Sequence, residues 1–148
     1  MPFNRSVPTG GNTGINQPSS FLDGSTIYGN TNDDLRRIRD FGNRGKMLLI
    51  KDSTPDGSFG FPPVDGVGNY IYGYSAEFGR NVFTDFFHIL FLREHNRLCG
   101  ELFAIYGNTW DDERYFREAR RWIIAFIQKI TYYEYRKLNC KKSPFRFI

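Results

Sequence analysis

Apolar residues recur at helical spacing in two stretches of the second half of the chain. The first stretch, about 81–106, contains no proline and is apolar on nearly every side from 86 to 92. A helix of that kind is buried, so the pattern predicts a central helix. The second stretch, about 112–138, repeats apolar residues at helical spacing: Phe116, Ala119, Ile123, Phe126, Ile127, Ile130 and Leu138.

The connection between these two predicted helices covers about 107–111, and its shortness predicts an antiparallel helical hairpin. Thr109 is followed three residues later by Asp112, which resembles a capping box. This pair predicts where the second helix begins.

Turn-forming residues dominate the first half, because residues 1–75 hold most of the 15 glycines and all but one of the 7 prolines. Only short helices fit between such breakers, and we expect them at about 21–28 and 33–41. The second of these has Thr31 or Asn32 as its N-cap. Its apolar face is predicted to consist of Leu35, Ile38 and Phe41. The rest, up to residue 75, is predicted to be a long loop.

The sequence therefore predicts a mainly α fold, with a central long antiparallel helix pair at 76–148 and a loop-rich N-terminal half at 1–75. With 40% hydrophobic and 18% aromatic residues, the chain has the composition of a packed domain and not of a disordered one. No internal repeat occurs, and no apolar run is long enough for a transmembrane segment.

The formal net charge of +4 arises in the second half, and five basic residues without an acid crowd the last thirteen positions. They are Arg136, Lys137, Lys141, Lys142 and Arg146. Such a cluster suits phosphates or an anionic surface, but cations also complement the negative end of a helix dipole, which is the simpler interpretation. No nucleic-acid-binding module is recognisable, so no nucleic-acid partner is predicted.

The two cysteines are predicted to be unpaired thiols, because Cys99 and Cys140 lie ~30 Å apart along the predicted antiparallel helices. The two histidines raise more possibilities. His95 follows a strongly apolar turn and is open to three interpretations: a metal or haem ligand, a proton carrier, or a core histidine satisfied by a neighbour. His88 lies two helical turns earlier, ~10 Å away, which is too far to share one small metal ion with His95.

Several strings in the sequence resemble the animal-type haem peroxidase superfamily, which also includes cyclooxygenases and fatty-acid dioxygenases. The strings are FFHILFLREHNRLCGELF at 86–103, WDDERYFREAR at 110–120, SSFLDGSTIYGN at 19–30 and PFNRSVP at 2–8. The likeness covers nearly the whole chain in colinear order. It implies that 1–148 is an internal piece, a partial haem peroxidase domain, of a helical fold built around a buried haem.

The resemblance also implies which haem residues to expect. In the family, the histidine of the REHNR string is not the iron ligand, and the segments with the proximal and distal histidines match nothing here. The family position of the distal arginine corresponds to Glu77, whose carboxylate would repel negative charge on a breaking peroxide bond. Arg80 is therefore the candidate for this catalytic and haem-binding role; the alternative is a surface arginine at a helix start.

A loop near the N-terminus offers oxygen ligands at alternate positions: the side chains of Ser19, Asp23 and Ser25 and the carbonyl of Phe21. Calcium prefers such hard oxygen ligands. The resemblance implies the same, because peroxidases of the family bind calcium at the matching positions and cyclooxygenases do not. The alternative is that Asp23 and Ser25 cap a helix or turn.

The function implied by the resemblance is that of a haem-dependent peroxidase, an oxidoreductase that oxidises small donor molecules with hydrogen peroxide. Without either haem histidine, the isolated chain is expected to be inactive and to need the missing remainder of the domain. Two alternatives remain open: a fragment of a fatty-acid oxygenase and a non-catalytic calcium-binding remnant. Full-length relatives are commonly secreted or lumenal, but no signal peptide is recognisable here, so the compartment is not predicted.

Overall fold

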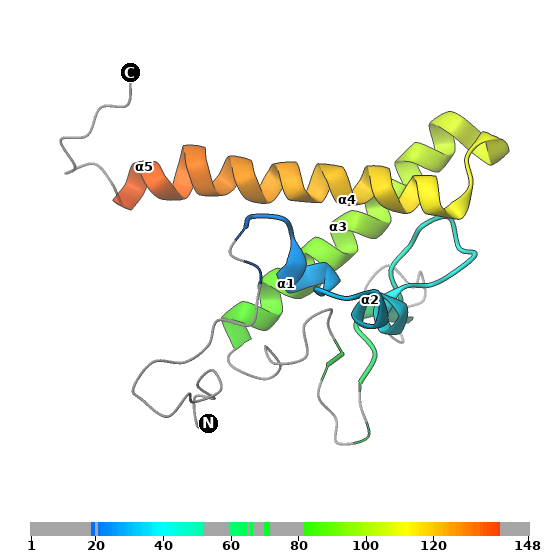
Figure 1. The fold of residues 1–148 in the computed structure, drawn as a ribbon, viewed down its shortest axis with the longest axis horizontal. Helices are drawn as coiled ribbons and strands as arrows, with labels where there is room; N and C mark the ends of the chain where they lie inside the picture. Colours follow the sequence, from blue (N-terminus) through cyan, green and yellow to red (C-terminus); the bar gives the residue numbers. More distant parts are fainter. Residues whose placement is uncertain are drawn as a thin grey trace.

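The computed structural model describes residues 19, 21–51, 60–64, 66, 70–71 and 82–139. Its largest elements are the helices α3 (Val82–Tyr106) and α4 (Asp112–Lys129), joined by the 3-10 turn η2 (Gly107–Thr109). Figure 1 shows that α3 and α4 cross obliquely and separate with distance from their connection. The predicted mainly α fold with a long helix pair is confirmed.

The helix α4 continues as one rod through the π-helix η3 (Ile130–Tyr135) into α5 (Arg136–Asn139). Within this rod the Thr131 hydroxyl donates a hydrogen bond to the carbonyl of Ile127 at 2.8 Å. Hydroxyls that bond back to the preceding turn disturb regular helix geometry, and this one lies at the start of the π segment. The predicted helix at 112–138 is confirmed as a rod, with a π-helical insert that periodicity did not indicate.

The start of α4 differs from the prediction in its cap. Asp111 is the N-cap residue, and its side chain accepts a hydrogen bond from the backbone N–H of Arg114 at 2.8 Å. The Thr109 hydroxyl instead donates to the carbonyl of Tyr106. The predicted capping role of Thr109 is therefore wrong, because Asp111 is one residue before the first helical position and has the better acceptor.

The two short helices are α1 (Ser25–Tyr28) and α2 (Asn32–Ile38). The first begins later than predicted because Gly24 has a positive φ of 72° and interrupts the chain before Ser25. The second is capped by Thr31, which is one of the two predicted N-cap residues and forms a capping box with Asp34.

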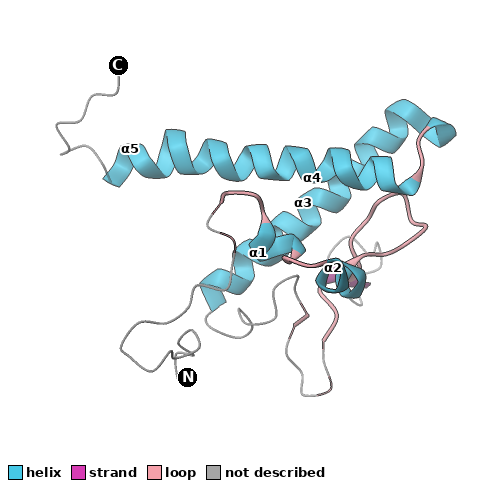
Figure 2. Ribbon diagram, in the orientation of Figure 1, coloured by secondary structure: helices cyan, strands magenta, loops and turns pink. Residues whose placement is uncertain are grey.

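The helix predicted at 33–41 ends earlier than expected, at Ile38, because Arg39 is extended. Phe41 is 59% exposed and does not belong to the apolar face. The region predicted as a long loop also contains two short antiparallel strands, β1 (Ile50–Lys51) and β2 (Gly60–Phe61), which no periodicity indicated. Figure 2 shows that helices and loops make up nearly all of the described part of the chain.

The hydrophobic core lies where α1, α2, α3 and α4 meet. Its buried residues are Ile27, Tyr28, Ile38, Met47, Leu92, Leu98, Cys99, Phe116, Ala119 and Ile123. Cys99 is an unpaired thiol, as predicted, and burial raises its pKa to about 12. Cys140 lies outside the described residues.

The first turns of α3 are not buried as the sequence predicted. Phe83 is 80% exposed, and Phe86, Phe87 and Leu90 are exposed as well. Leu138, at the far end of the rod formed by α4, η3 and α5, is also exposed. Among the residues that the structure describes, no helix has the length and apolar character needed to cross a membrane.

Candidate functional site

His95 is the middle residue of the polar segment 93–97 on α3, and its imidazole is fully buried. Its Nε2 lies 2.9 Å from the carbonyl oxygen of Gly45, and its Nδ1 lies 2.8 Å from the hydroxyl of Tyr28. Because a carbonyl only accepts, Nε2 holds the proton, and the neutral ring accepts the Tyr28 O–H at Nδ1. The interpretation of His95 as a core histidine satisfied by neighbours is confirmed.

Electrostatics keep His95 neutral. Burial lowers the pKa of His95 to about 4, and the hydrogen bond to Gly45 opposes this only partly, while the positive charges of Arg39 and Arg120 lower it further. Burial also raises the pKa of Tyr28, so its hydroxyl stays protonated and remains a donor. The guanidinium of Arg120 lies over the Tyr28 ring, 5.0 Å from its centroid.

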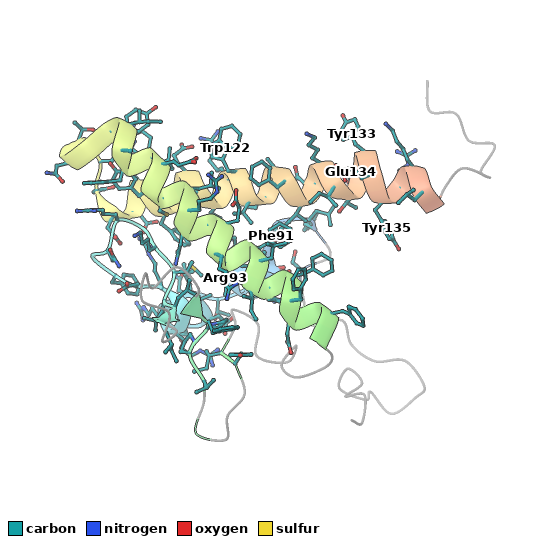
Figure 3. The ribbon with its side chains drawn as sticks, turned by 180° about the vertical axis from the view of Figure 1, so that it is seen from behind. Phe91, Arg93, Trp122, Tyr133, Glu134 and Tyr135 are labelled. Atoms are coloured by element: carbon teal, nitrogen blue, oxygen red, sulfur yellow. The ribbon has the colours of Figure 1, made fainter. Side chains whose placement is uncertain are left out.

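The neighbours of His95 on α3 attach the helix to the loop-rich half. The side-chain amide of Asn96 accepts the N–H of Met47 at 2.7 Å and donates to its carbonyl at 2.9 Å. Nε of Arg93 donates to the carbonyl of Gly60 at 2.9 Å, and Figure 3 shows this side chain beside α3 on the side of the loops. Arg93, His95 and Asn96 of the REHNR string thus make structural contacts with other parts of the chain.

A buried arginine that the sequence did not single out joins α2 to α4. Arg39 donates to Asp112 at 2.9 Å and to Glu113, and its guanidinium lies 4.2 Å from the centroid of Phe116. The second oxygen of Asp112 accepts the backbone N–H of Gly45 at 2.7 Å. The two acidic residues at the start of α4 indicate that a basic partner is needed there, but the sequence does not identify it, because Arg39 lies more than 70 residues away.

The 19–25 loop brings three of its four predicted ligands together. The carboxylate of Asp23 accepts the backbone N–H of Ser25 at 3.0 Å and receives hydrogen bonds from the side chains of Ser19 and Ser25. Burial raises the pKa of Asp23, but these hydrogen bonds outweigh it and hold the pKa below its ordinary value.

Other features of the 19–25 loop fit the alternative that it is a turn. The Ser25 N–H bond is an Asx-type turn that leads into α1. The backbone N–H of Phe21 is also used within the loop, as a donor to the Ser19 hydroxyl at 3.2 Å. In the described part of the chain, no cluster of three or more His, Cys, Asp or Glu side chains is present that would form a metal site by itself.

The hydrogen bonds of His95 argue against this residue as an axial ligand of a haem. The chain has two histidines, and the second, His88, uses Nε2 to donate to the carbonyl of Thr26 at 3.0 Å. His95 uses both ring nitrogens, as shown above. The imidazole of His95 is therefore not available as an iron ligand in this fold. The candidate distal arginine, Arg80, and the neighbouring Glu77 lie outside the described residues.

The sequence matches the family model of the animal haem peroxidases over residues 1–141. Peroxinectin A of Dictyostelium discoideum is 34% identical over 129 residues, which cover 82% of this chain and 24% of that protein. Human myeloperoxidase is 31% identical over 155 residues, covering 91% of this chain and 20% of that protein. The chain thus belongs to the animal haem peroxidase family, a family of oxidoreductases, and spans about a quarter or less of the length of these relatives.

Solved structures share the fold. Peroxidase A of Dictyostelium discoideum matches with a TM-score of 0.68 and 27% identity, over 90% of this chain and 30% of that chain. A fatty acid alpha-dioxygenase of Arabidopsis thaliana matches with a TM-score of 0.60 and 25% identity, over 85% of this chain and 19% of that chain. Family membership implies a haem in the complete domain, and the fold described above corresponds to one portion of it.

Proposed function

We propose that this chain is part of a haem-dependent peroxidase domain, which oxidises small donor molecules with hydrogen peroxide. The observation that supports the proposal is the family match over residues 1–141 together with the similarity to Peroxidase A. A haem supplies the redox chemistry of such enzymes, and the protein supplies position and electrostatics. The contribution of this chain is the rigid packing of α3 against α1 and α4.

The chain alone should not perform this reaction, because both ring nitrogens of His95 bond to protein groups and the chain matches only 30% of Peroxidase A. We expect the 148-residue chain, mixed with haem and peroxide, to show no saturable oxidation of a phenolic donor. A chimaera of Peroxidase A from Dictyostelium discoideum, with this chain in place of the matched portion, should bind haem and oxidise the donor. A chimaera that shows a normal haem spectrum but no peroxide-dependent oxidation would contradict the proposal.

A fatty-acid oxygenase is the second candidate, and the structural similarity to the Arabidopsis alpha-dioxygenase favours it. The similarity to Peroxidase A has the higher TM-score and identity, so the peroxidase proposal has the stronger support. Oxygen uptake by the same chimaera with a fatty acid, in the absence of any phenolic donor, would favour the oxygenase. Arg80 stays a prediction for the cation that stabilises charge on the peroxide.

We further propose that Ser19, Asp23, Ser25 and the carbonyl of Phe21 bind calcium. Support comes from the convergence of the two hydroxyls on the Asp23 carboxylate, since hard oxygen ligands at one place suit calcium. These four oxygens are fewer than the six to eight that calcium prefers, so water or other groups complete the site. A non-catalytic calcium-binding role, the remaining alternative, predicts the same binding without any oxidation by the chimaera.

Calcium should raise the melting temperature of the chain, because a ligand that binds the folded state stabilises it. At a calcium concentration of about 100 times Kd, the free energy of unfolding should increase by about 2.7 kcal/mol. Calorimetry with and without calcium measures this gain, which Asp23→Ala should abolish. Asp33→Ala is the matched control, because the Asp33 side chain is an exposed carboxylate on α2, and it should keep the full gain. An equal calcium-dependent gain in stability in Asp23→Ala would contradict the proposed site.

A further inference from the structure

Both histidines of this chain contact the same short helix. His88 donates from Nε2 to the carbonyl of Thr26 at 3.0 Å, and His95 accepts the hydroxyl of Tyr28 at 2.8 Å. Both imidazoles are buried, and they lie seven residues, or about two turns, apart on α3. They therefore hold α1 at two points along one side of α3, and Figure 1 shows α1 lying beside this part of α3.

We infer that His88 and His95 are positioning residues that couple the 19–25 loop to α3 through α1. The first residue of α1 is Ser25, which is also a predicted oxygen ligand and a hydrogen-bond partner of Asp23. Ser25 thus belongs both to the loop and to the four-residue helix that His88 and His95 contact. This inference deepens the calcium site proposed above and rests on it for the ligand, but the coupling can be measured without any metal.

The physical reason for the coupling is that α1 cannot hold its own position. A helix of 4 residues has almost no intrinsic stability, so its place is determined by tertiary contacts. The Tyr28 ring is enclosed by His95 and by Phe116 of α4, with ring centroids 5.5 and 5.8 Å away. Gly24 also lies against this ring, because a Cβ there would be 3.2 Å from Tyr28.

Two consequences follow from this arrangement. Loosening the 19–25 loop should loosen the part of α3 around 88–95, since Tyr28 and Thr26 would lose their fixed positions. In the other direction, a change on α3 should alter the affinity of the loop for a cation, because coupling between two sites is reciprocal.

The first test uses the calcium-free chain and hydrogen exchange of backbone amides at 88–95. Asp23→Ala removes the carboxylate that orders the loop, and it should speed exchange in this part of α3 by about tenfold, a typical coupling factor. In a chain that already contains Tyr28→Phe and His88→Leu, the same Asp23→Ala change should alter exchange there by less than about twofold. Equal acceleration in both backgrounds would overturn the inference.

Two further variants separate coupling from simple loss of stability. Tyr115→Phe removes another buried phenol hydroxyl, which donates to the Gly107 carbonyl at the start of η2. It should leave the effect of Asp23→Ala on α3 intact. His88→Gln, which keeps an N–H donor for Thr26, should retain more of the coupling than His88→Leu does. A loss of coupling in Tyr115→Phe as large as in Tyr28→Phe would count against a specific role of the two histidines.

The second test adds calcium chloride to the wild-type chain. Protection of amides at both 21–28 and 88–95 supports the calcium site and the coupling together. Protection at 21–28 alone would contradict the coupling and leave the calcium site supported. No protection at 21–28 would contradict the calcium site, and the calcium-free measurement would then decide the coupling by itself.

Discussion

At the scale of single residues, the buried histidines of α3 are tolerated because each has a partner with a matching hydrogen-bonding group. Leaving a buried donor or acceptor without a partner costs about 1–3 kcal/mol. His95 satisfies a donor requirement with Gly45 and an acceptor requirement with Tyr28. Its neutral state follows mainly from its burial, and this has a measurable effect on stability.

His95 should make the free energy of unfolding fall as the solution is acidified. Its pKa in the folded chain, about 4, lies below the ordinary value of 6.5, so the unfolded chain takes up the proton first. The stabilisation is fully present above pH 6.5 and is lost progressively as the pH falls toward 4. Between pH 7 and pH 5 we expect a loss of about 2 kcal/mol, measurable by urea unfolding.

The control for this measurement is His95→Gln, whose amide can still donate to Gly45 and accept from Tyr28 but does not titrate. Other groups, such as Asp23 and Glu113, have lowered pKa values and contribute mainly at lower pH. The difference between wild type and His95→Gln therefore isolates His95. If the two chains lose stability in parallel between pH 7 and pH 5, the buried neutral imidazole is not the cause.

The sequence predicted that His95 needs a partner, but it left the role of His95 open among three interpretations and did not identify the partners. A histidine placed directly after an apolar turn must enter the interior and needs a partner there. Its two partners lie 50 and 67 residues away in sequence, in regions without hydrophobic periodicity. Arg39 was missed for the same reason, because only the folded chain brings it to the acidic start of α4.

At the scale of elements, the sequence predicted the long helices nearly to their ends, but not the start of α1, the end of α2 or the cap of α4. The long helices have strong periodicity, which local sequence records directly. The ends depend on single hydrogen bonds and backbone angles: Gly24 delays α1, Arg39 ends α2 and Asp111 caps α4. The exposed first turns of α3 show a second limit, because an apolar pattern indicates that a surface will be covered but not by which part of the protein.

One glycine determines how closely the loop around residues 40–47 approaches α4. Gly45 has a φ of +76°, and a Cβ at this position would lie 2.2 Å from the backbone nitrogen of Phe116. That nitrogen belongs to a helix and cannot move aside easily. Gly45→Ala should therefore lower the free energy of unfolding by about 3 kcal/mol or more, as measured by denaturant unfolding.

Gly42→Ala separates the two causes of this loss. Gly42 has a similar φ of +80°, but nothing lies within 4 Å of the added Cβ. It should cost only about 1 kcal/mol, the backbone strain of a left-handed alanine. Similar losses in the two variants would mean that the contact between Gly45 and α4 does not determine how closely the loop packs.

At the scale of the whole molecule, two groups of exposed apolar side chains lie at the two diverging ends of the crossed helices. One group is on the first turns of α3: Phe83, Phe86, Phe87 and Leu90. The other is on the rod formed by η3 and α5: Ile130, Tyr132, Tyr133, Tyr135 and Leu138. Figure 3 shows Tyr133 and Tyr135 on opposite sides of this rod, so no single flat surface would cover both.

Exposed apolar surface of this extent is uncommon on a protein that works alone. The matched portion of Peroxidase A is 30% of that chain, which leaves ample further sequence in a complete domain to cover such a surface. We therefore expect the isolated chain to bind a hydrophobic dye and to self-associate as its concentration increases. Dye fluorescence and sedimentation velocity measure the two effects.

Substitutions on α3 locate the surface responsible. Phe83→Ser combined with Phe86→Ser should reduce both dye binding and self-association, because it removes two of the most exposed rings of the first group. Ile105→Ser is the matched control: Ile105 is 71% exposed on the same helix, at the end near η2 and away from both groups. It should change neither property. A wild-type chain that stays monomeric without binding dye would show that these rings need no cover, and the exposed ends would then be ordinary surface.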